Sequence, residues 1–304
     1  MTLFEKSLVT IELQAVLEML SLEASTAGGK ERAAGIVPST DRFEVESSLK
    51  ETTAAKKMME LRGSLSLGGI QDVSGSVSRA DRGGTLNCRE LMDIASVLRY
   101  AESAIKYAGE DRQEPTAIDY LFYGLHGNKY LEKKISGAII SEDEIADSAS
   151  RELMDIRRHM RIAGDKVRQA LNKVITSPAY SKYLQDPIIT MKNNRYVVPV
   201  KAEYKSAVPG LVHDISSSGA TLFIEPMSAV QANNEIRELL AKEQKEIDRI
   251  LAELSGEVAS HKEDIVSDYR TLIELDLIFA KAKLSYKLNG DEPEISDTGK
   301  LILK

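Results

Sequence analysis

Apolar residues recur at every third or fourth position along two long stretches of the chain, 141–176 and 227–285. The first stretch carries them at Ile145, Ala149, Leu153, Ile156, Met160, Ala163, Val167, Ala170 and Val174. This spacing is that of an amphipathic helix, and so narrow a stripe is typical of a helix that packs against a single partner. The pattern predicts two long antiparallel helices, with Glu243 interrupting the apolar stripe of the second.

Residues at the ends of these stretches suggest where each helix begins and ends. Ser141 followed by Glu144 has the form of a capping box, which predicts that the first helix begins there. Pro178 ends the first helix, and Pro226 suits the first turn of the second. At 272–280 the second stretch becomes broadly apolar, which indicates that the chain enters a larger core.

The segment between the two helices, 187–226, is rich in β-branched residues and proline. Asn193-Asn194 separates two such runs and predicts a hairpin. A second strand pair is expected at 211–216 and 221–224, with a turn at 217–219. Pro199 and Pro209 indicate edge strands or bulges. The segment therefore predicts a small antiparallel β module.

The remainder of the chain predicts shorter helices with Gly-rich breaks. They are expected at 3–24, from 39–41 to 61, at 87–108 behind an Asn87-x-x-Glu90 capping box, and at 116–138; 301–303 suggests a further strand. The predicted fold class is mainly α: a helical core with two long antiparallel helices carrying a small antiparallel β module. The predicted domains are a core of 1–140 and 262–304, the long helices 141–176 and 227–261, and the β module 177–226.

Composition narrows the class of protein. The 304 residues contain no apolar run long enough to cross a membrane, and the N-terminus lacks the pattern of a signal peptide. The single Cys88 excludes an intrachain disulfide and a cysteine-based metal cluster. We expect a cytoplasmic protein that does not interact with membranes.

Charge is unevenly distributed along the chain. The net charge is −7, yet residues 151–205 hold 12 Lys/Arg against five Asp/Glu, so the other residues carry −14. Such polarity can direct one end of a molecule toward a polyanion, although a solvated helix face explains it equally well. The candidate phosphate-contacting residues are Arg157, Arg158, Arg161, Arg168, Lys173, Lys192, Arg195, Lys201 and Lys205.

Aromatic residues are interleaved with these cations. Tyr180, Tyr183, Tyr196 and Tyr204 could stack on bases, but a role in the small β core is the favoured interpretation.

Sequence motifs of catalysis are missing. Gly28-Gly29-Lys30 does not fit a phosphate loop, no G-x-S-x-G elbow occurs, and the histidines lack metal-ligand spacing. His213-Asp214 beside Ser216 is best interpreted as a hydrogen-bonded turn rather than a catalytic group. We therefore predict no catalytic residue, no metal site and no cofactor within this chain.

The run 210–226, followed by Asn233-Asn234-Glu235-Ile236-Arg237-Glu238-Leu239, resembles the second bacterial branch of the MutS family, MutS-two. The segments 65–72 and 82–86 are similar to that branch as well, and the resemblance spans the whole chain. It implies a helical core, lever helices and a clamp domain. The clamp motif residues are Gly210, His213, Asp214, Ser218, Gly219, Phe223, Glu225 and Pro226.

The resemblance also implies a larger protein. Members of this branch continue into an ATPase domain and a small nuclease domain, so the chain is interpreted as an N-terminal part that ends where the ATPase would begin. The full-length form is expected to use ATP and Mg, to form homodimers, to bind branched DNA and nick DNA, to restrain recombination, and in some bacteria to act on collided ribosomes.

Two hypotheses follow for the chain itself. In the first, the basic helices and the β module grip branched or double-stranded DNA or ribosomal RNA. In the second, the chain is a structural coiled-coil module for dimerisation and transmission, with nucleic acid bound elsewhere.

Overall fold

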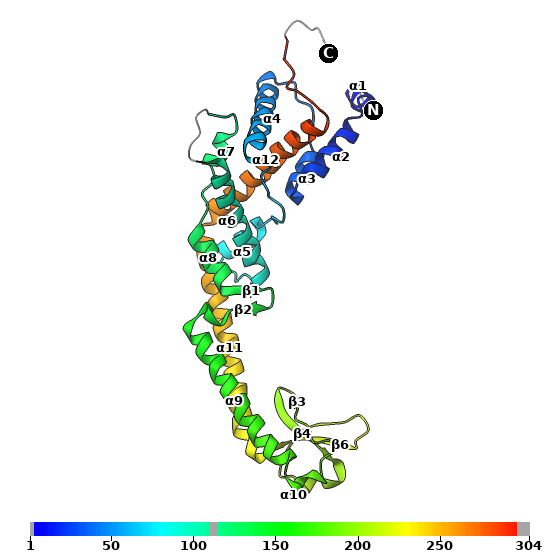
Figure 1. Ribbon diagram of the computed structural model, residues 1–304, viewed down its shortest axis with the longest axis vertical. Coiled ribbons are helices and arrows are strands. Elements are labelled where there is room, and N and C mark those ends of the chain that lie inside the picture. Colours follow the sequence, from blue (N-terminus) through cyan, green and yellow to red (C-terminus); the bar gives the residue numbers. More distant parts are fainter. Residues whose placement is uncertain (1–2, 110–114, 297–304) are drawn as a thin grey trace. The chain divides into compact units, whose positions relative to one another are not determined.

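The computed structural model describes residues 3–109 and 115–296 (Figure 1). These residues are mainly helical and contain two small antiparallel sheets, which confirms the predicted fold class. The strand expected at 301–303 lies outside the described residues. The chain divides into two compact units: Met1–Glu144 with Leu251–Lys304, here called the discontinuous unit, and Ile145–Ile250, here called the central unit.

The discontinuous unit is built around one long helix. The structure places its elements at α1 (Leu3–Thr10), α2 (Leu13–Glu23), α3 (Ala27–Ala34), α4 (Arg42–Arg62), α5 (Ser74–Asp81), α6 (Cys88–Ala108), α7 (Asp119–Tyr123), α8 (Lys129–Ala138), β1 (Ile139–Ser141) and α12 (Lys262–Lys287). α12 packs against α2, α3, α4, α5 and α6. Its run 272–280 is buried except for Glu274, which confirms that the broadly apolar stretch enters a core.

Capping residues fix the helix starts in this unit. Asn87 and Glu90 form the predicted capping box, each side chain accepting a hydrogen bond from the other residue's backbone N–H. The side chain of Asp41 caps α4 at Glu44 N. The single helix expected at 3–24 is wrong: the chain turns at Glu12, whose φ of 55° is left-handed, and α1 contacts α2 instead of extending it.

Two buried aspartates of α12 hold loops of this unit. Asp276 accepts hydrogen bonds from the backbone N–H of Ser25 and Thr26 and from the Thr26 hydroxyl, at 2.6–3.1 Å. Thr26 in turn caps α3 at Gly29 N. Asp268 accepts from His126 N and Gly127 N at 2.8 and 2.9 Å. Both carboxylates are therefore satisfied largely by backbone donors.

The central unit consists of two long helices and a sheet. Its elements are η1 (Asp147–Ala149), α9 (Arg151–Ile175), α10 (Pro178–Ser181), β3 (Thr190–Lys192), β4 (Arg195–Lys201), η2 (Ala202–Ala207), β5 (Gly210–Ile215), β6 (Thr221–Pro226) and α11 (Met227–Ser260), which continues into the discontinuous unit after Ile250. Contacts of Ser150 with Glu246, Arg157 with Glu243 and Lys166 with Glu235 show that α9 and α11 run antiparallel, side by side (Figure 1).

One hydrophobic cluster joins the helices and the sheet of the central unit. Its buried members are Ile156, Ala163, Val167, Leu171, Val174, Leu184, Val198, Val200, Val208, Leu222, Ile224, Ala229, Ile236 and Leu239. Most of the predicted stripe of α9 lies in this cluster, facing α11 and the sheet. The narrow stripe is therefore buried by contacts within the same chain.

The first long helix begins later than predicted, so its expected start at Ser141 is wrong. Residues 142–143 instead turn between β1 and β2 (Glu144–Ile145), which form the two-stranded sheet. The helix begins after Ser150, whose hydroxyl accepts a hydrogen bond from Leu153 N at 2.9 Å. Ser150 also donates to Glu246 on α11, which ties the helix start to its partner.

The larger sheet has the strand order β3-β4-β6-β5, with all pairs antiparallel. Asn193 and Asn194 form the predicted hairpin turn, with φ values of 49° and 59°. Pro199 lies in the inner strand β4, beyond the last β3 pair; its carbonyl accepts from Gln185 N, so its missing N–H faces away from β6. The pairing of β5 with β6 shifts by one residue at His213, which forms a bulge.

Candidate nucleic-acid interface

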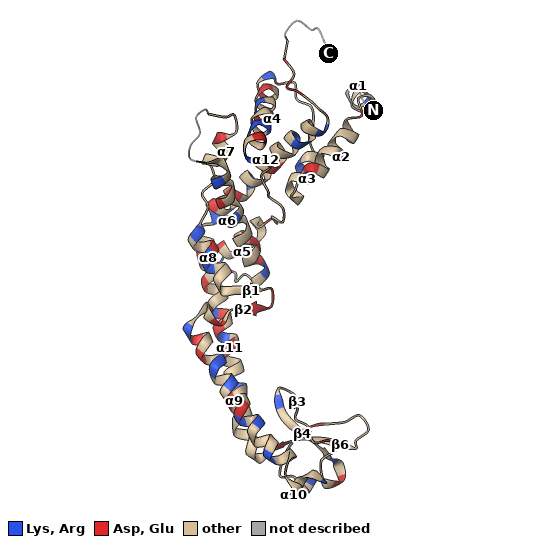
Figure 2. Ribbon diagram, in the orientation of Figure 1, with Lys and Arg blue, Asp and Glu red and all other residues tan. Residues whose placement is uncertain are grey.

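The outer face of α9 carries four of the predicted cations. Arg158, Arg161, Arg168 and Lys173 are exposed, at helix positions away from the buried stripe. Figure 2 shows Lys and Arg recurring along α9, interspersed with acidic residues. The arginine side chains retain 60–64% of their accessible surface. They pair with Asp155, Asp147 and Asp165 at 3.3–3.8 Å. Exposed pairs of this kind contribute less than about 1 kcal/mol, so phosphates can compete for these guanidinium groups.

Arg157 has a different environment from its neighbours. Its side chain is only 20% exposed; it donates to Glu243 at 2.6 Å and to Asp147 and the Ile145 carbonyl at 2.7 Å. The hydrogen bond from Arg157 lowers the pKa of the Asp147 carboxyl. Arg157 therefore pairs with Glu243, the residue that interrupts the stripe of α11, and its Nε and Nη1 donors are engaged inside the unit.

The candidate cations of the sheet and of η2 also separate into two groups. Lys192 is partly exposed, lies 3.0 Å from Asp214, and has its ammonium 4.4 Å from the centre of the Phe223 ring. Lys205 is exposed, and the half-buried Lys201 donates to the Lys182 carbonyl at 3.3 Å. Arg195 is 13% exposed and is held by a buried carboxylate.

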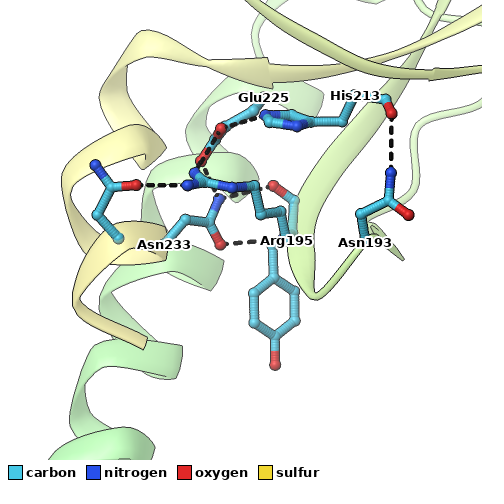
Figure 3. A network of polar contacts seen from close by, with 7 residues as sticks. Asn193, Arg195, His213, Glu225 and Asn233 are labelled. Atoms are coloured by element: carbon cyan, nitrogen blue, oxygen red, sulfur yellow. Dashed lines mark hydrogen bonds and ion pairs between the residues drawn. The ribbon is translucent and has the colours of Figure 1, made fainter. Parts of the chain in front are cut away.

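That carboxylate belongs to Glu225, the centre of a polar network (Figure 3). The side chain of Glu225 is fully buried and accepts from Arg195 at 2.7 and 2.9 Å, from His213 Nε2 at 2.5 Å and from Asn233 at 2.7 Å. The Asn233 side chain also accepts a hydrogen bond from the Tyr196 N–H and donates one to the Tyr196 carbonyl, both at 3.0 Å. The network joins β4, β5, β6 and α11, so Arg195, like Arg157, is engaged in holding the unit together.

The remaining motif residues shape the β5–β6 hairpin. A Cβ on Gly210 would lie 2.2 Å from the Glu225 carbonyl oxygen, so close strand pairing requires glycine there. Gly219 has a φ of 73° in the turn, where the hydroxyls of Ser218 and Ser216 lie 3.3 Å apart. Pro226 ends β6 directly before α11.

Three of the four tyrosines pack against the hydrophobic cluster: Tyr180, Tyr183 and Tyr196. Tyr204 lies in η2 and is 38% exposed. Lys182 entered the sequence count of positive charge but was not selected as a candidate. Lys182 lies close to Lys201 because Leu184 pairs with Val200. No local sequence pattern predicts this pairing.

Within 3–109 and 115–296, no three His, Cys, Asp or Glu side chains are placed to hold a metal ion. No helix in these described ranges has the length and hydropathy needed to cross a membrane.

No family model matches the chain, but curated relatives align with nearly all of it. It is 44% identical over 303 residues to the "Endonuclease MutS2" of Acetivibrio thermocellus, 43% over 302 residues to that of Ruminiclostridium cellulolyticum, and 44% over 303 residues to that of Clostridioides difficile. The chain belongs to the MutS2 family. Each alignment covers 99% of the chain and 38% of the relative, so the chain spans well under half the length of these MutS2 proteins. Membership confirms the resemblance seen at 210–226.

Proposed function

We propose that the central unit binds double-stranded or branched nucleic acid through its phosphates. The observation that carries the proposal is the outer face of α9, where Arg158, Arg161, Arg168 and Lys173 are exposed at positions outside the packed stripe. Arginine forms strong charge-assisted hydrogen bonds to phosphate oxygens, and such contacts position a duplex without reading its sequence. Lys192 and Lys201 of the sheet and Lys205 of η2 add further positive charge to the unit.

The distribution of charge between the units supports this assignment. Residues 145–250 hold 16 Lys/Arg and 13 Asp/Glu, a net charge of +3, so the rest of the chain carries −10. A polyanion is then attracted to the central unit and repelled by the discontinuous one. Membership of a family whose relatives are named endonucleases favours DNA as the polyanion.

For the complete protein we extend the proposal by family membership. It would be a cytoplasmic, homodimeric ATPase that requires Mg, carries a nuclease domain, and acts on branched DNA, on collided ribosomes or on both. None of these activities is assigned to a residue of this chain. The role of this chain in the complete protein would be to bind the nucleic acid.

A structural dimerisation module is the second candidate. Its main support was the narrow stripe of α9, but that stripe packs against α11 and the sheet of the same chain. Dimerisation through the central unit would therefore need another surface. Sedimentation over a range of concentrations tests this candidate, because it requires a concentration-dependent increase in mass.

Titration of the chain with a labelled four-way junction, a duplex and ribosomes, over a range of salt concentrations, tests the nucleic-acid proposal. We expect the triple variant Arg158→Gln, Arg161→Gln, Arg168→Gln to bind the junction at least about tenfold more weakly. The slope of log affinity against log salt should fall by about 1 for each phosphate that the variant no longer neutralises.

The matched control carries Lys50→Gln, Lys57→Gln and Lys133→Gln, which remove the same charge from exposed positions of the discontinuous unit. We expect it to bind nearly as the parent chain does. Equal losses in the two triple variants, or no binding at low salt, would contradict the proposal.

A further inference from the structure

Tyr204 differs from the other tyrosines of the central unit. Tyr180, Tyr183 and Tyr196 are partly buried against the hydrophobic cluster, whereas Tyr204 is 38% exposed. It lies at a kink inside η2, with φ −107° and ψ 23°. Packing of the β core therefore accounts for three of the four rings and leaves the fourth open to another role.

Packing against Tyr183 supports the exposed ring. The ring centres of Tyr183 and Tyr204 lie 5.1 Å apart at an interplanar angle of 48°. Tyr183 rests against the cluster, and the ammonium group of Lys182 lies 4.9 Å from the centre of its ring. Tyr204 is thus an exposed aromatic ring that packs on a partly buried one. A ring held in this way loses little conformational entropy when a ligand binds.

Three lysines belong to the two chain segments that carry this aromatic pair. Lys182 and Lys205 are exposed, and Lys201 is half-buried with its ammonium on the Lys182 carbonyl. The backbone fixes these segments to each other, since Lys201 N donates to Tyr183 O and Gln185 N to Pro199 O, both at 3.0 Å. Asp186 and Glu203 are exposed acids of the same two segments, so with the three lysines residues 182–186 and 199–205 carry a net charge of +1.

We propose that Tyr204, supported by Tyr183 and flanked by Lys182, Lys201 and Lys205, is a stacking platform for an unpaired base of a single-stranded nucleic acid. An aromatic face combined with nearby cations is the arrangement that binds single strands without sequence preference, since every base has a flat face and every nucleotide a phosphate. Bases inside a duplex are covered on both faces by their neighbours, so the platform distinguishes unpaired from paired strands.

The inference deepens the proposed function and rests on it, because it gives the nucleic-acid interface two components. The outer face of α9 would contact duplex phosphates, and the platform would bind a base where pairing is interrupted, as at a branch. The chemistry is shared by DNA and RNA, so the test includes a single strand of each.

The experiment measures equilibrium binding of the whole chain to labelled oligothymidylate and oligouridylate of about 12 nucleotides, and to a blunt DNA duplex. Loss of one stacked base typically weakens single-strand binding by about fivefold or more, which is the change expected for Tyr204→Ala. Tyr204→Phe keeps the ring and should bind as the parent chain does. Tyr130→Ala, which removes a 70% exposed tyrosine of α8, is the matched control and should have no effect.

A 2-aminopurine base in the single strand gives a second readout. Stacking on an aromatic ring quenches its fluorescence, so the quenching should occur with the parent chain and Tyr204→Phe and be lost with Tyr204→Ala. A loss of affinity through misfolding would instead appear in the circular dichroism melt and would reduce duplex binding as well.

The outcomes separate the two proposals. Unchanged single-strand affinity and quenching in Tyr204→Ala, with duplex binding intact, overturns only the platform; a surface that docks a protein predicts this result. Equal losses on single strands and duplex, with an unchanged circular dichroism melt, also overturn it. Single-strand binding that depends on Tyr204, without any duplex or junction binding, supports the platform and overturns the duplex grip on α9. A larger effect on oligouridylate than on oligothymidylate would assign the site to RNA.

Discussion

The two units bury their acidic side chains in different ways. In the discontinuous unit, Asp276 and Asp268 accept hydrogen bonds mainly from backbone N–H groups of loops. In the central unit, Glu225 accepts from three side chains, one of which is the guanidinium of Arg195. The aspartates fix loops to α12, a helix that is already buried. Glu225 joins three strands and a helix that share one hydrophobic cluster.

The difference predicts what each unit loses when its carboxylate is removed. When Asp276 is replaced by asparagine, the backbone N–H groups lose the carboxylate, but the amide oxygen can still accept some of their hydrogen bonds. Without Glu225, a cation that is 13% exposed has no counter-charge. Because an unpaired buried charge costs more than an imperfect hydrogen bond, the central unit should be the more sensitive of the two.

The largest effect is expected for Glu225→Gln. Breaking a buried ion pair on one side costs about 3–5 kcal/mol, so the free energy of unfolding of the central unit should fall by that order. Urea unfolding followed by peptide-resolved hydrogen exchange measures this loss and assigns it to residues 145–250. Glu235→Gln is the control, since Glu235 pairs with Lys166 at 3.6 Å on the surface and should contribute less than about 1 kcal/mol. Similar losses of stability for Glu225→Gln and Glu235→Gln would show that the buried ion pair contributes no more than a surface one.

A smaller effect is expected for Asp276→Asn. The amide oxygen can still accept from Ser25 or Thr26, but its NH2 group cannot, so we expect a loss of about 1–3 kcal/mol. The same exchange measurement should place this loss at α3 and α12, with the central unit unchanged. A loss as large as that of Glu225→Gln would show that backbone and side-chain donors are equivalent here, and the comparison would fail.

The third effect depends on pH: it is largest at neutral pH and disappears in acid. The hydrogen bond from Arg249, opposed by burial and assisted by Ser150, lowers the pKa of Glu246 from 4.5 to about 2. Between these values the unfolded chain binds more protons than the folded one, so this contribution to stability is complete above about pH 4.5 and is lost as the pH falls toward 2.

Unfolding midpoints of the parent chain and of Glu246→Gln, measured from pH 6 to 2, test this contribution. The difference between the two midpoints should shrink steadily as the pH falls through that window. A constant difference would mean that Glu246 acts through packing rather than through its charge.

Local chemistry made much of the fold predictable. The spacing of apolar residues identified α9 and α11, Asn87 with Glu90 fixed the start of α6, and Asn193-Asn194 gave the hairpin. Each signal acts over a few residues, where side chains and backbone meet regardless of the rest of the chain. The error at Ser141 has the same origin, because Ser-x-x-Glu also suits a turn between two short strands.

The candidate site was less predictable, because exposure depends on residues far away in sequence. Arg157 and Arg158 are equivalent in a charge count, yet Arg157 meets Glu243, 86 residues later, and Arg158 remains on the surface. Arg195 is buried by Glu225 and by Asn234 of α11. Only the packing of α9, α11 and the sheet separates the cations that hold the unit together from those that remain accessible.

The discontinuous unit also has a consequence for synthesis of the chain. Ser25 and its partner Asp276 are 251 residues apart, and at about 5–20 residues per second the early helices would wait roughly 10–50 s for α12 to be translated. The central unit, by contrast, draws its hydrophobic cluster from residues 156–239 alone. The middle of the polypeptide can therefore mature before its beginning, and the first-made helices are the ones that chaperones would need to shield.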